Sequence, residues 1–156
     1  MAKEKKPAKE TKEEPAKRTG LGYADKTWDD RLADLEKRRQ HALGMGGKAK
    51  LEKRHNQGHL NARERIDKLV DPGTFLESGL FGSSAVYPED AEKTPTDGKI
   101  TGYGKIHGRD VAFVVNDFTV KGASTSATNS KKLGWVKTTA QQKGFPMIFV
   151  GESTGA

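Results

Sequence analysis

The chain has 156 residues and no cysteine, which excludes disulfide bonds, thiolate zinc sites and cysteine nucleophiles. Its formal net charge is +7, and a net charge of +6 falls before Phe75, where basic residues number 19 and acidic residues 13. Leu, Ile, Val and Phe supply 9 of the first 74 residues but 19 of the remaining 82, so the second part is expected to form the core.

The first part of the chain is predicted to be a tail followed by helices. Residues 1–22 are rich in Lys, Glu, Ala and Pro, a composition typical of a solvated, disordered tail. Residues 23–73 are expected to form a helical segment. Thr27 and Asn61 are its predicted N-caps, because each is followed three residues later by an acidic side chain. A further short helix is expected around Leu51.

Residues 74–156 carry the pattern of a layered α/β unit. Short apolar runs between Gly, Pro and Asp predict strands over 75–80, 99–106 and 111–118, with a loop over 87–97 and a hairpin turn over 107–110. The third of these strands is almost wholly apolar in its middle, which predicts burial on both faces. A helix over 127–143 should lead to a second buried strand over 147–150, parallel to the third through a right-handed crossover.

The loop over residues 121–126 joins a predicted strand to a predicted helix. Its free N–H groups and the helix dipole can hold a phosphate or a developing oxyanion, and Lys121, Lys131 and Lys132 would add positive charge. An ordinary N-cap by Ser124 or Ser126 explains the same residues equally well. The sequence alone leaves both interpretations open.

The segment Gly151 to Gly155 matches the pattern G-x-S-x-G directly after a strand, the context of a hydrolase nucleophile elbow with Ser153 as nucleophile. A hydrolase of that type has its histidine later in the chain, whereas all four histidines here precede Ser153. A glycine loop whose backbone N–H groups serve a ligand is therefore favoured. His55 and His59 lie four residues apart without an evident third ligand, so no metal site is predicted.

Five stretches match, in order and spacing, the motifs of one enzyme family. Residues 61–75, NARERIDKLVDPGTF, are similar to its entry segment TARERI-LLDPGSF. The others, at 97–104, 116–120, 122–124 and 153–156, are similar to GDGVVTGYG, QDFTV, GGS and SGGA. The chain thus resembles, from about Leu32 to its last residue, the carboxyltransferase (β) subunits of biotin-dependent acyl-CoA carboxylases.

This resemblance implies an α/β fold of the crotonase type, a superhelix of β-β-α turns entered through helices that pack on a neighbouring subunit. Residues 74–156 would form its start. The implied activity is transfer of a carboxyl group from carboxybiotin to the α carbon of an acyl-CoA, through an enolate held in a backbone oxyanion hole. Thr154 and Gly155 fall on the glycine pair of that hole, and Gly122, Ala123 and Ser124 would line the acyl-CoA side of the pocket. Thr154 and Ala123 depart from the family by replacing glycines.

The resemblance also implies partners. Biotin would arrive as carboxybiotin on a biotin carboxylase or biotin carboxyl carrier subunit, and the chain would assemble into a homo-oligomer, a hexamer in the family. Propionyl-CoA and fatty acid metabolism are the expected context. Family members are considerably longer, so the chain is expected to be a truncated N-terminal region that is inactive alone. No apolar run is long enough for a membrane span and no signal or transit peptide is expected, so a cytoplasmic location is predicted.

Two other classes of function compete with this interpretation. A nucleic-acid-binding module would use the basic N-terminal arm, but only Tyr23 and Trp28 supply aromatic rings before Phe75, so nucleic acid is not an expected partner. A serine hydrolase would use Ser153.

Overall fold

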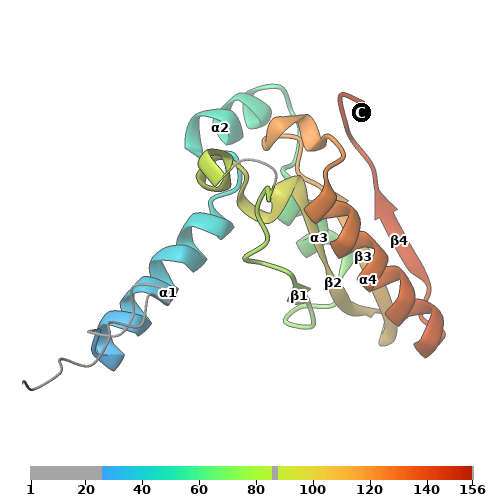
Figure 1. The fold of residues 1–156 in the computed structure, drawn as a ribbon. Helices are drawn as coiled ribbons and strands as arrows, with labels where there is room; N and C mark the ends of the chain where they lie inside the picture. Colours follow the sequence, from blue (N-terminus) through green and yellow to red (C-terminus); the bar gives the residue numbers. More distant parts are fainter. Residues whose placement is uncertain (1–25, 86–87, 156) are drawn as a thin grey trace, which may run out of the picture.

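The computed structural model describes residues 26–85 and 88–155, and the predicted tail over 1–22 lies outside them. The described chain begins with three α-helices, α1 (Trp28–Leu43), α2 (Lys48–Asn56) and α3 (Ala62–Leu69). Strands and the long helix α4 (Ala127–Lys143) follow, and α4 lies across one face of the sheet (Figure 1).

The predicted N-caps are confirmed. The Thr27 side chain accepts a hydrogen bond from the Asp30 amide at 3.2 Å, and the Asn61 side chain accepts one from the Glu64 amide at 3.0 Å. In both cases the acidic side chain bonds back to the amide of the cap, so the start of the helix satisfies its own donors. The short helix expected around Leu51 is also present, as α2.

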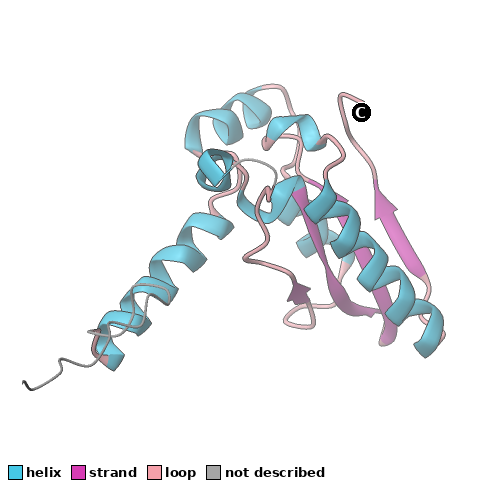
Figure 2. Ribbon diagram, viewed as in Figure 1, coloured by secondary structure: helices cyan, strands magenta, loops and turns pink. Residues whose placement is uncertain are grey.

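Within residues 26–85 and 88–155, four strands form one sheet in the order β1 (Leu76–Ser78), β2 (Lys99–Ile106), β3 (Arg109–Asn116) and β4 (Met147–Val150). The first three are antiparallel, and β4 runs parallel to β3 (Figure 2). Because α4 connects β3 to β4, the chain contains the expected β-β-α unit followed by a parallel strand.

The apolar middle of β3 is buried on both faces, as predicted. Phe113 and Val115 face a cluster that includes residues of α3, and the Phe113 ring meets the Phe75 ring edge-on with centroids 6.3 Å apart. Ala112 and Val114 face the opposite cluster, which includes Val136 of α4. The core therefore sits on the two sides of the β2–β3 hairpin.

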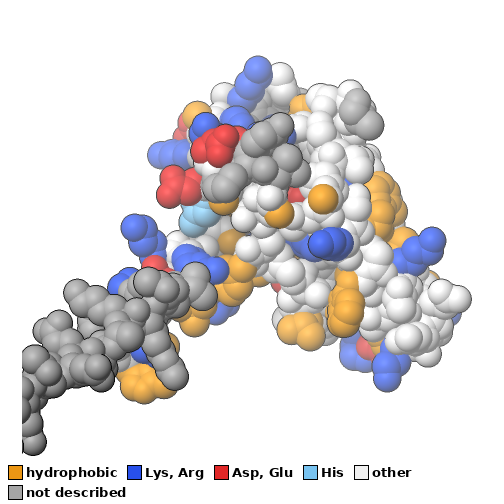
Figure 3. All heavy atoms as spheres, in the orientation of Figure 1, with side chains coloured by type: hydrophobic (Ala, Val, Ile, Leu, Met, Phe, Trp, Pro, Cys, Tyr) orange, Lys and Arg blue, Asp and Glu red, His pale blue; other side chains and the backbone are white. Residues whose placement is uncertain are grey.

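The prediction that 147–150 is a buried strand is wrong, because none of its four residues is buried. The side chains of Ile148 and Val150 pack against the α3-side cluster, but Met147 is 40% and Phe149 49% exposed. The physical reason is that β4 is an edge of the described sheet, while α4 packs on β2 and β3. Hydrophobic surface is visible beside β4 in Figure 3.

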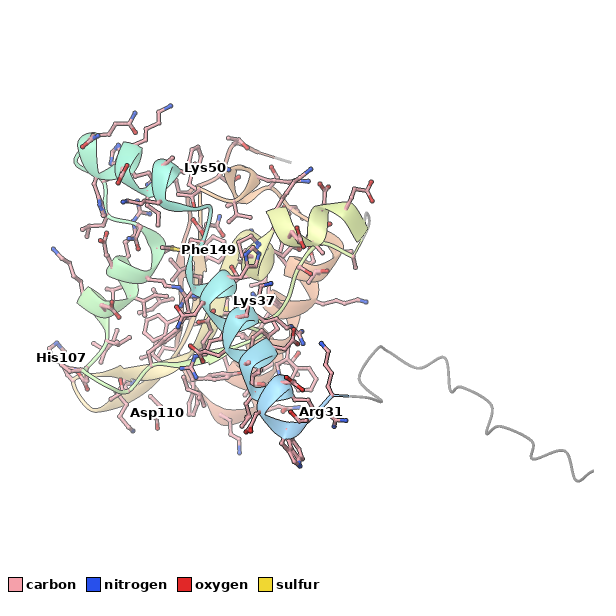
Figure 4. The ribbon with its side chains drawn as sticks, turned by 90° about the vertical axis from the view of Figure 1, so that its left-hand side faces the viewer. Arg31, Lys37, Lys50, His107, Asp110 and Phe149 are labelled. Atoms are coloured by element: carbon pink, nitrogen blue, oxygen red, sulfur yellow. The ribbon has the colours of Figure 1, made fainter. Side chains whose placement is uncertain are left out.

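Several predicted boundaries also differ. Residues 88–97 form short 3₁₀ turns, η1 (Pro88–Lys93) and η2 (Pro95–Gly98), rather than a plain loop, and the strand expected over 75–80 shortens to β1. The hairpin turn is confined to His107 and Gly108, both at positive φ, and β3 begins at Arg109 and ends at Asn116 instead of Phe118. His107 and Asp110 lie near this turn, away from Lys50 of α2 (Figure 4).

Helix α1 extends away from the sheet, and its apolar residues find little cover in the described chain (Figure 1). Trp28, Leu32 and Leu35 are all exposed, whereas Ala42 near the other end is buried. The spacing of the three exposed residues places them on one side of the helix. None of the helices described combines the length and the apolar character that a membrane crossing requires.

Candidate functional site

The structure brings the two predicted site loops into contact. We call residues 121–126 the first loop and residues 151–155 the second loop. The Thr154 amide donates a hydrogen bond to the Gly122 carbonyl oxygen at 3.0 Å, and the Thr154 and Ser124 hydroxyl oxygens lie 3.4 Å apart. The residues predicted for the oxyanion hole and those predicted for the acyl-CoA side of the pocket therefore lie side by side.

Both predicted oxyanion donors are hydrogen-bonded within the chain. The Thr154 amide is bonded to Gly122, as described, and the Gly155 amide donates to the Ser153 hydroxyl at 2.9 Å. Both acceptors are neutral oxygens. A ligand oxygen could reach these amides only by replacing those acceptors.

The first loop contains three consecutive residues with positive φ. Lys121, Gly122 and Ala123 have φ values of 44°, 59° and 54°, and the left-handed conformation costs a residue with a Cβ about 1–2 kcal/mol. Gly122 has a second requirement, because a Cβ there would lie 2.5 Å from the Thr154 hydroxyl. The two residues that replace family glycines therefore differ in backbone conformation. Ala123 has a positive φ in spite of its Cβ. In the second loop the residue with positive φ is Gly155, at 108°, and not Thr154.

A buried lysine of β2 is hydrogen-bonded to the first loop. Lys99 of β2 donates to the Ala123 carbonyl oxygen at 3.3 Å and to the Asn116 side-chain oxygen at 3.1 Å. Burial lowers the pKa of Lys99, against the opposing effect of the Asp97 carboxylate. The two contacts fix the loop to both strands of the hairpin.

The end of the first loop is an N-cap, so the capping interpretation is confirmed for Ser126. The Ser126 hydroxyl accepts from the Asn129 amide at 3.1 Å, and the Asp97 carboxylate accepts from the same amide at 2.9 Å and from the Ser126 hydroxyl. The N-terminus of α4 therefore already holds a carboxylate, and a ligand anion there would compete with Asp97. Ser124 is not the cap.

Two of the three lysines expected to give the first loop a positive charge contact acceptors within the chain. The Lys121 ammonium lies 2.5 Å from the Asp90 carboxylate. The Lys132 ammonium points inward and donates to the carbonyl oxygens of Thr96, at 2.8 Å, and Lys99. Burial lowers the pKa of Lys132 to about 8. The sequence could not show these partners, and a contribution of Lys121 and Lys132 to ligand binding stays a prediction.

A cavity of about 230 Å³ lies beside the first loop. Ser84, Thr94, Ser124, Thr125 and Ser126 are among its lining residues, together with the paired Lys121 and Asp90. This lining suits a polar part of a ligand whose reacting end reaches the contact between the two loops.

The second loop is anchored by residues that the sequence did not single out. Glu152 pairs with Arg54 of α2 and Arg65 of α3, and its backbone oxygen accepts from the Asn116 side chain at 3.1 Å. Glu152 is the single charged residue of the second loop, and this was the one sequence feature that could have indicated an ion pair here. Its two partners lie far away in the sequence, so spacing could not identify them.

The geometry gives little support to a side-chain nucleophile or a metal. Within the described ranges, Ser153 bonds to the Gly155 amide and to no histidine. His55 forms a local hydrogen bond with the Glu64 carboxylate at 2.8 Å. Across the part of the chain that the structure describes, no three potential ligands form a metal-binding group.

Comparison with known proteins decides the family. The family model described as "Carboxyl transferase domain" matches residues 53–156, about two thirds of the chain. The chain belongs to the carboxyl transferase domain family. The α/β, crotonase-like fold implied by the resemblance is thereby confirmed.

Relatives of this family are similar over most of the chain. It is 38% identical over 132 residues to the propionyl-CoA carboxylase carboxyltransferase subunit of Haloferax mediterranei, covering 83% of the chain and 26% of that protein. It is 40% identical over 129 residues to the propionyl-CoA carboxylase beta chain of Roseobacter denitrificans, covering 81% and 25%. The chain therefore spans about a quarter of the length of these relatives.

A solved structure shows the same arrangement. The transcarboxylase 12S crystal structure, described as a hexamer with methylmalonyl-coenzyme A and methylmalonic acid bound, superposes with a TM-score of 0.77 at 38% identity. The match covers 84% of this chain and 26% of that one.

Proposed function

We propose that this chain supplies the acyl-CoA side of a biotin-dependent carboxyltransferase, which moves a carboxyl group from carboxybiotin to the α carbon of an acyl-CoA. The observation that carries the proposal is the 3.0 Å hydrogen bond from Thr154 to Gly122, because it joins the two loops that the family motifs identify. The names of the relatives favour a short acyl group such as propionyl.

The proposed role of the second loop is to hold the thioester oxygen as it becomes an enolate. The Thr154 and Gly155 amides would exchange the neutral oxygens of Gly122 and Ser153 for this oxygen. That exchange becomes more favourable as negative charge develops, since hydrogen bonds to an anionic acceptor are stronger. Gly122, Ala123 and Ser124 would line the acyl-CoA side.

Carboxybiotin, when bound, supplies the carboxyl group, so the chain itself need not provide a nucleophile. This agrees with the Ser153 hydroxyl, which serves as an internal acceptor. We propose that biotin is carried by a biotin carboxylase or carrier subunit, and that this chain works in a homo-oligomer in the cytoplasm. The exposed apolar side of α1 supports assembly with another chain.

Calorimetric titration of the 156-residue chain with propionyl-CoA tests the proposal. We expect saturable binding by the wild-type chain and by Ser153→Ala, which keeps every backbone donor, and we expect no reaction of Ser153 with a fluorophosphonate. A Ser153 adduct would support a hydrolase instead. Absence of CoA binding, together with DNA binding that weakens steeply with salt, would support the nucleic-acid alternative.

A further inference from the structure

The second loop is tied to the N-terminal helices through one carboxylate. A Glu152 oxygen lies 2.7 Å from a guanidinium nitrogen of Arg54 in α2 and 2.7 Å from one of Arg65 in α3. The side chains of Arg54, Arg65 and Glu152 are 9%, 23% and 30% exposed. We call these three residues the Glu152 clamp. Partly buried, doubly paired contacts of this kind are stronger than a surface ion pair.

The backbone of Glu152 is held as well. Asn116, the last residue of β3, donates to the Glu152 carbonyl oxygen at 3.1 Å, and the Arg54 guanidinium also lies over the Phe118 ring, 5.4 Å from its centroid. Glu152 is thus restrained from the sheet through its backbone and from two helices through its side chain. Thr154, two residues further on, makes the contact with Gly122.

The electrostatics agree with a Glu152 carboxylate that is charged at neutral pH. Partial burial alone would raise the pKa of Glu152, but the hydrogen bonds and charges of Arg54 and Arg65 leave it below its ordinary value. The carboxylate is therefore ionised at neutral pH.

We infer that Arg54 and Arg65 are positioning residues of the site: by holding Glu152 they keep the second loop where the Thr154 amide meets Gly122. The inference that this also favours substrate binding rests on the proposed function. The clamp would make the geometry of the site depend on α2 and α3, which contribute no residue to the contact between the loops.

The test compares the double variant Arg54→Gln/Arg65→Gln with Arg63→Gln in the 156-residue chain. Arg63 is a matched control, since its side chain is 20% exposed and pairs at 2.7 Å with Glu77, which belongs to β1 and not to the second loop. The readout is the ¹⁵N order parameter of the Thr154 and Gly155 amides. We expect values near 0.85 in the wild type to fall below about 0.6 in the double variant, while β3 amides and the control stay unchanged.

Two further variants keep the inference falsifiable. Arg65→Gln alone leaves Arg54 paired with Glu152 and replaces the double variant if that variant does not fold. We expect the order parameters of the Thr154 and Gly155 amides to fall less in Arg65→Gln than in the double variant. Arg54→Lys/Arg65→Lys retains both charges and should restore part of the order. Unchanged order parameters in folded Arg54 and Arg65 variants, or an equal fall in Arg63→Gln, would overturn the inference.

Propionyl-CoA titration of the same variants separates the inference from the proposed function. Weaker binding by the double variant than by Arg63→Gln supports the role in substrate binding, and equal binding overturns that role. If the wild-type chain binds no acyl-CoA, the proposed function fails, while the order parameters still decide whether the clamp positions the loop.

Discussion

The β2–β3 hairpin and the two site loops are held in place by different means. The hairpin buries apolar side chains on both faces, so its stability is spread over two clusters. The loops contain several residues at positive φ and depend on individual polar side chains of other elements. Lys99 and Asp97 hold the first loop, and Arg54 and Arg65 hold the second. A substitution in the core of the hairpin should therefore lower the stability of the whole fold. A substitution of a residue that holds a loop should change only the position or mobility of that loop.

The largest expected effect lies in the hairpin. Phe113→Ala removes a ring that is fully buried against Phe75 and should lower the free energy of unfolding by about 3–5 kcal/mol. Phe149→Ala on the edge strand is the control, because that ring is half exposed and should cost much less. Urea unfolding measures both. Equal losses would contradict the assignment of the core to β3.

The second prediction concerns catalysis by an assembled carboxyltransferase that contains this chain. Gly155→Pro deletes a proposed oxyanion donor and should lower kcat by about 100-fold to 1,000-fold. The loss should increase further because proline cannot adopt the φ of 108° found at Gly155. Ser153→Ala keeps the backbone amide and should change kcat little. The opposite pattern, in variants whose folding is verified by circular dichroism, would identify Ser153 as the reacting group.

The contact between the loops can be broken at Gly122. Gly122→Ala adds a Cβ at positive φ and 2.5 Å from the Thr154 hydroxyl, whereas Gly144→Ala meets the same backbone strain with nothing within 4 Å. We expect Gly144→Ala to cost about 1 kcal/mol and Gly122→Ala to cost more, with part of the excess removed by Thr154→Gly. Identical unfolding midpoints for the two alanine variants would show that the loops do not touch.

A smaller effect is expected from Lys132, whose pKa of about 8 in the folded chain lies below its ordinary value of 10.5. Between these pH values the unfolded chain binds the proton and the folded chain does not, so stability should rise as the pH increases from 8 to 10.5. Lys132→Met should remove most of that rise, which a shift of this size limits to about 3 kcal/mol. Parallel pH profiles for the two proteins would contradict the burial of the ammonium.

The features that the sequence predicted correctly are those with local signals. Capping residues three positions apart marked the starts of α1 and α3, and the apolar run of β3 marked a strand buried on both faces. The family motifs then located both site loops, which no spacing rule could have joined. Their roles as oxyanion donors and pocket lining stay predictions.

The features that the sequence missed depend on contacts between distant segments. The exposure of Phe149 follows from the position of β4 at the edge of the described sheet, which an apolar tetrapeptide does not encode. Lys121 and Lys132 looked available for a ligand because Asp90 and the carbonyl oxygens that receive them lie more than 30 residues away. The pairing of Glu152 with Arg54 and Arg65 has the same origin.

The central claim is that the two loops together form an acyl-CoA site. Its most direct test is a titration of the ¹⁵N-labelled 156-residue chain with propionyl-CoA, followed by the backbone amide shifts. We predict that the largest shifts occur at Gly122, Ala123, Ser124, Thr154 and Gly155, with small shifts at the hairpin turn. Saturable shifts confined to other parts of the chain, or no shifts at millimolar propionyl-CoA, would contradict the claim.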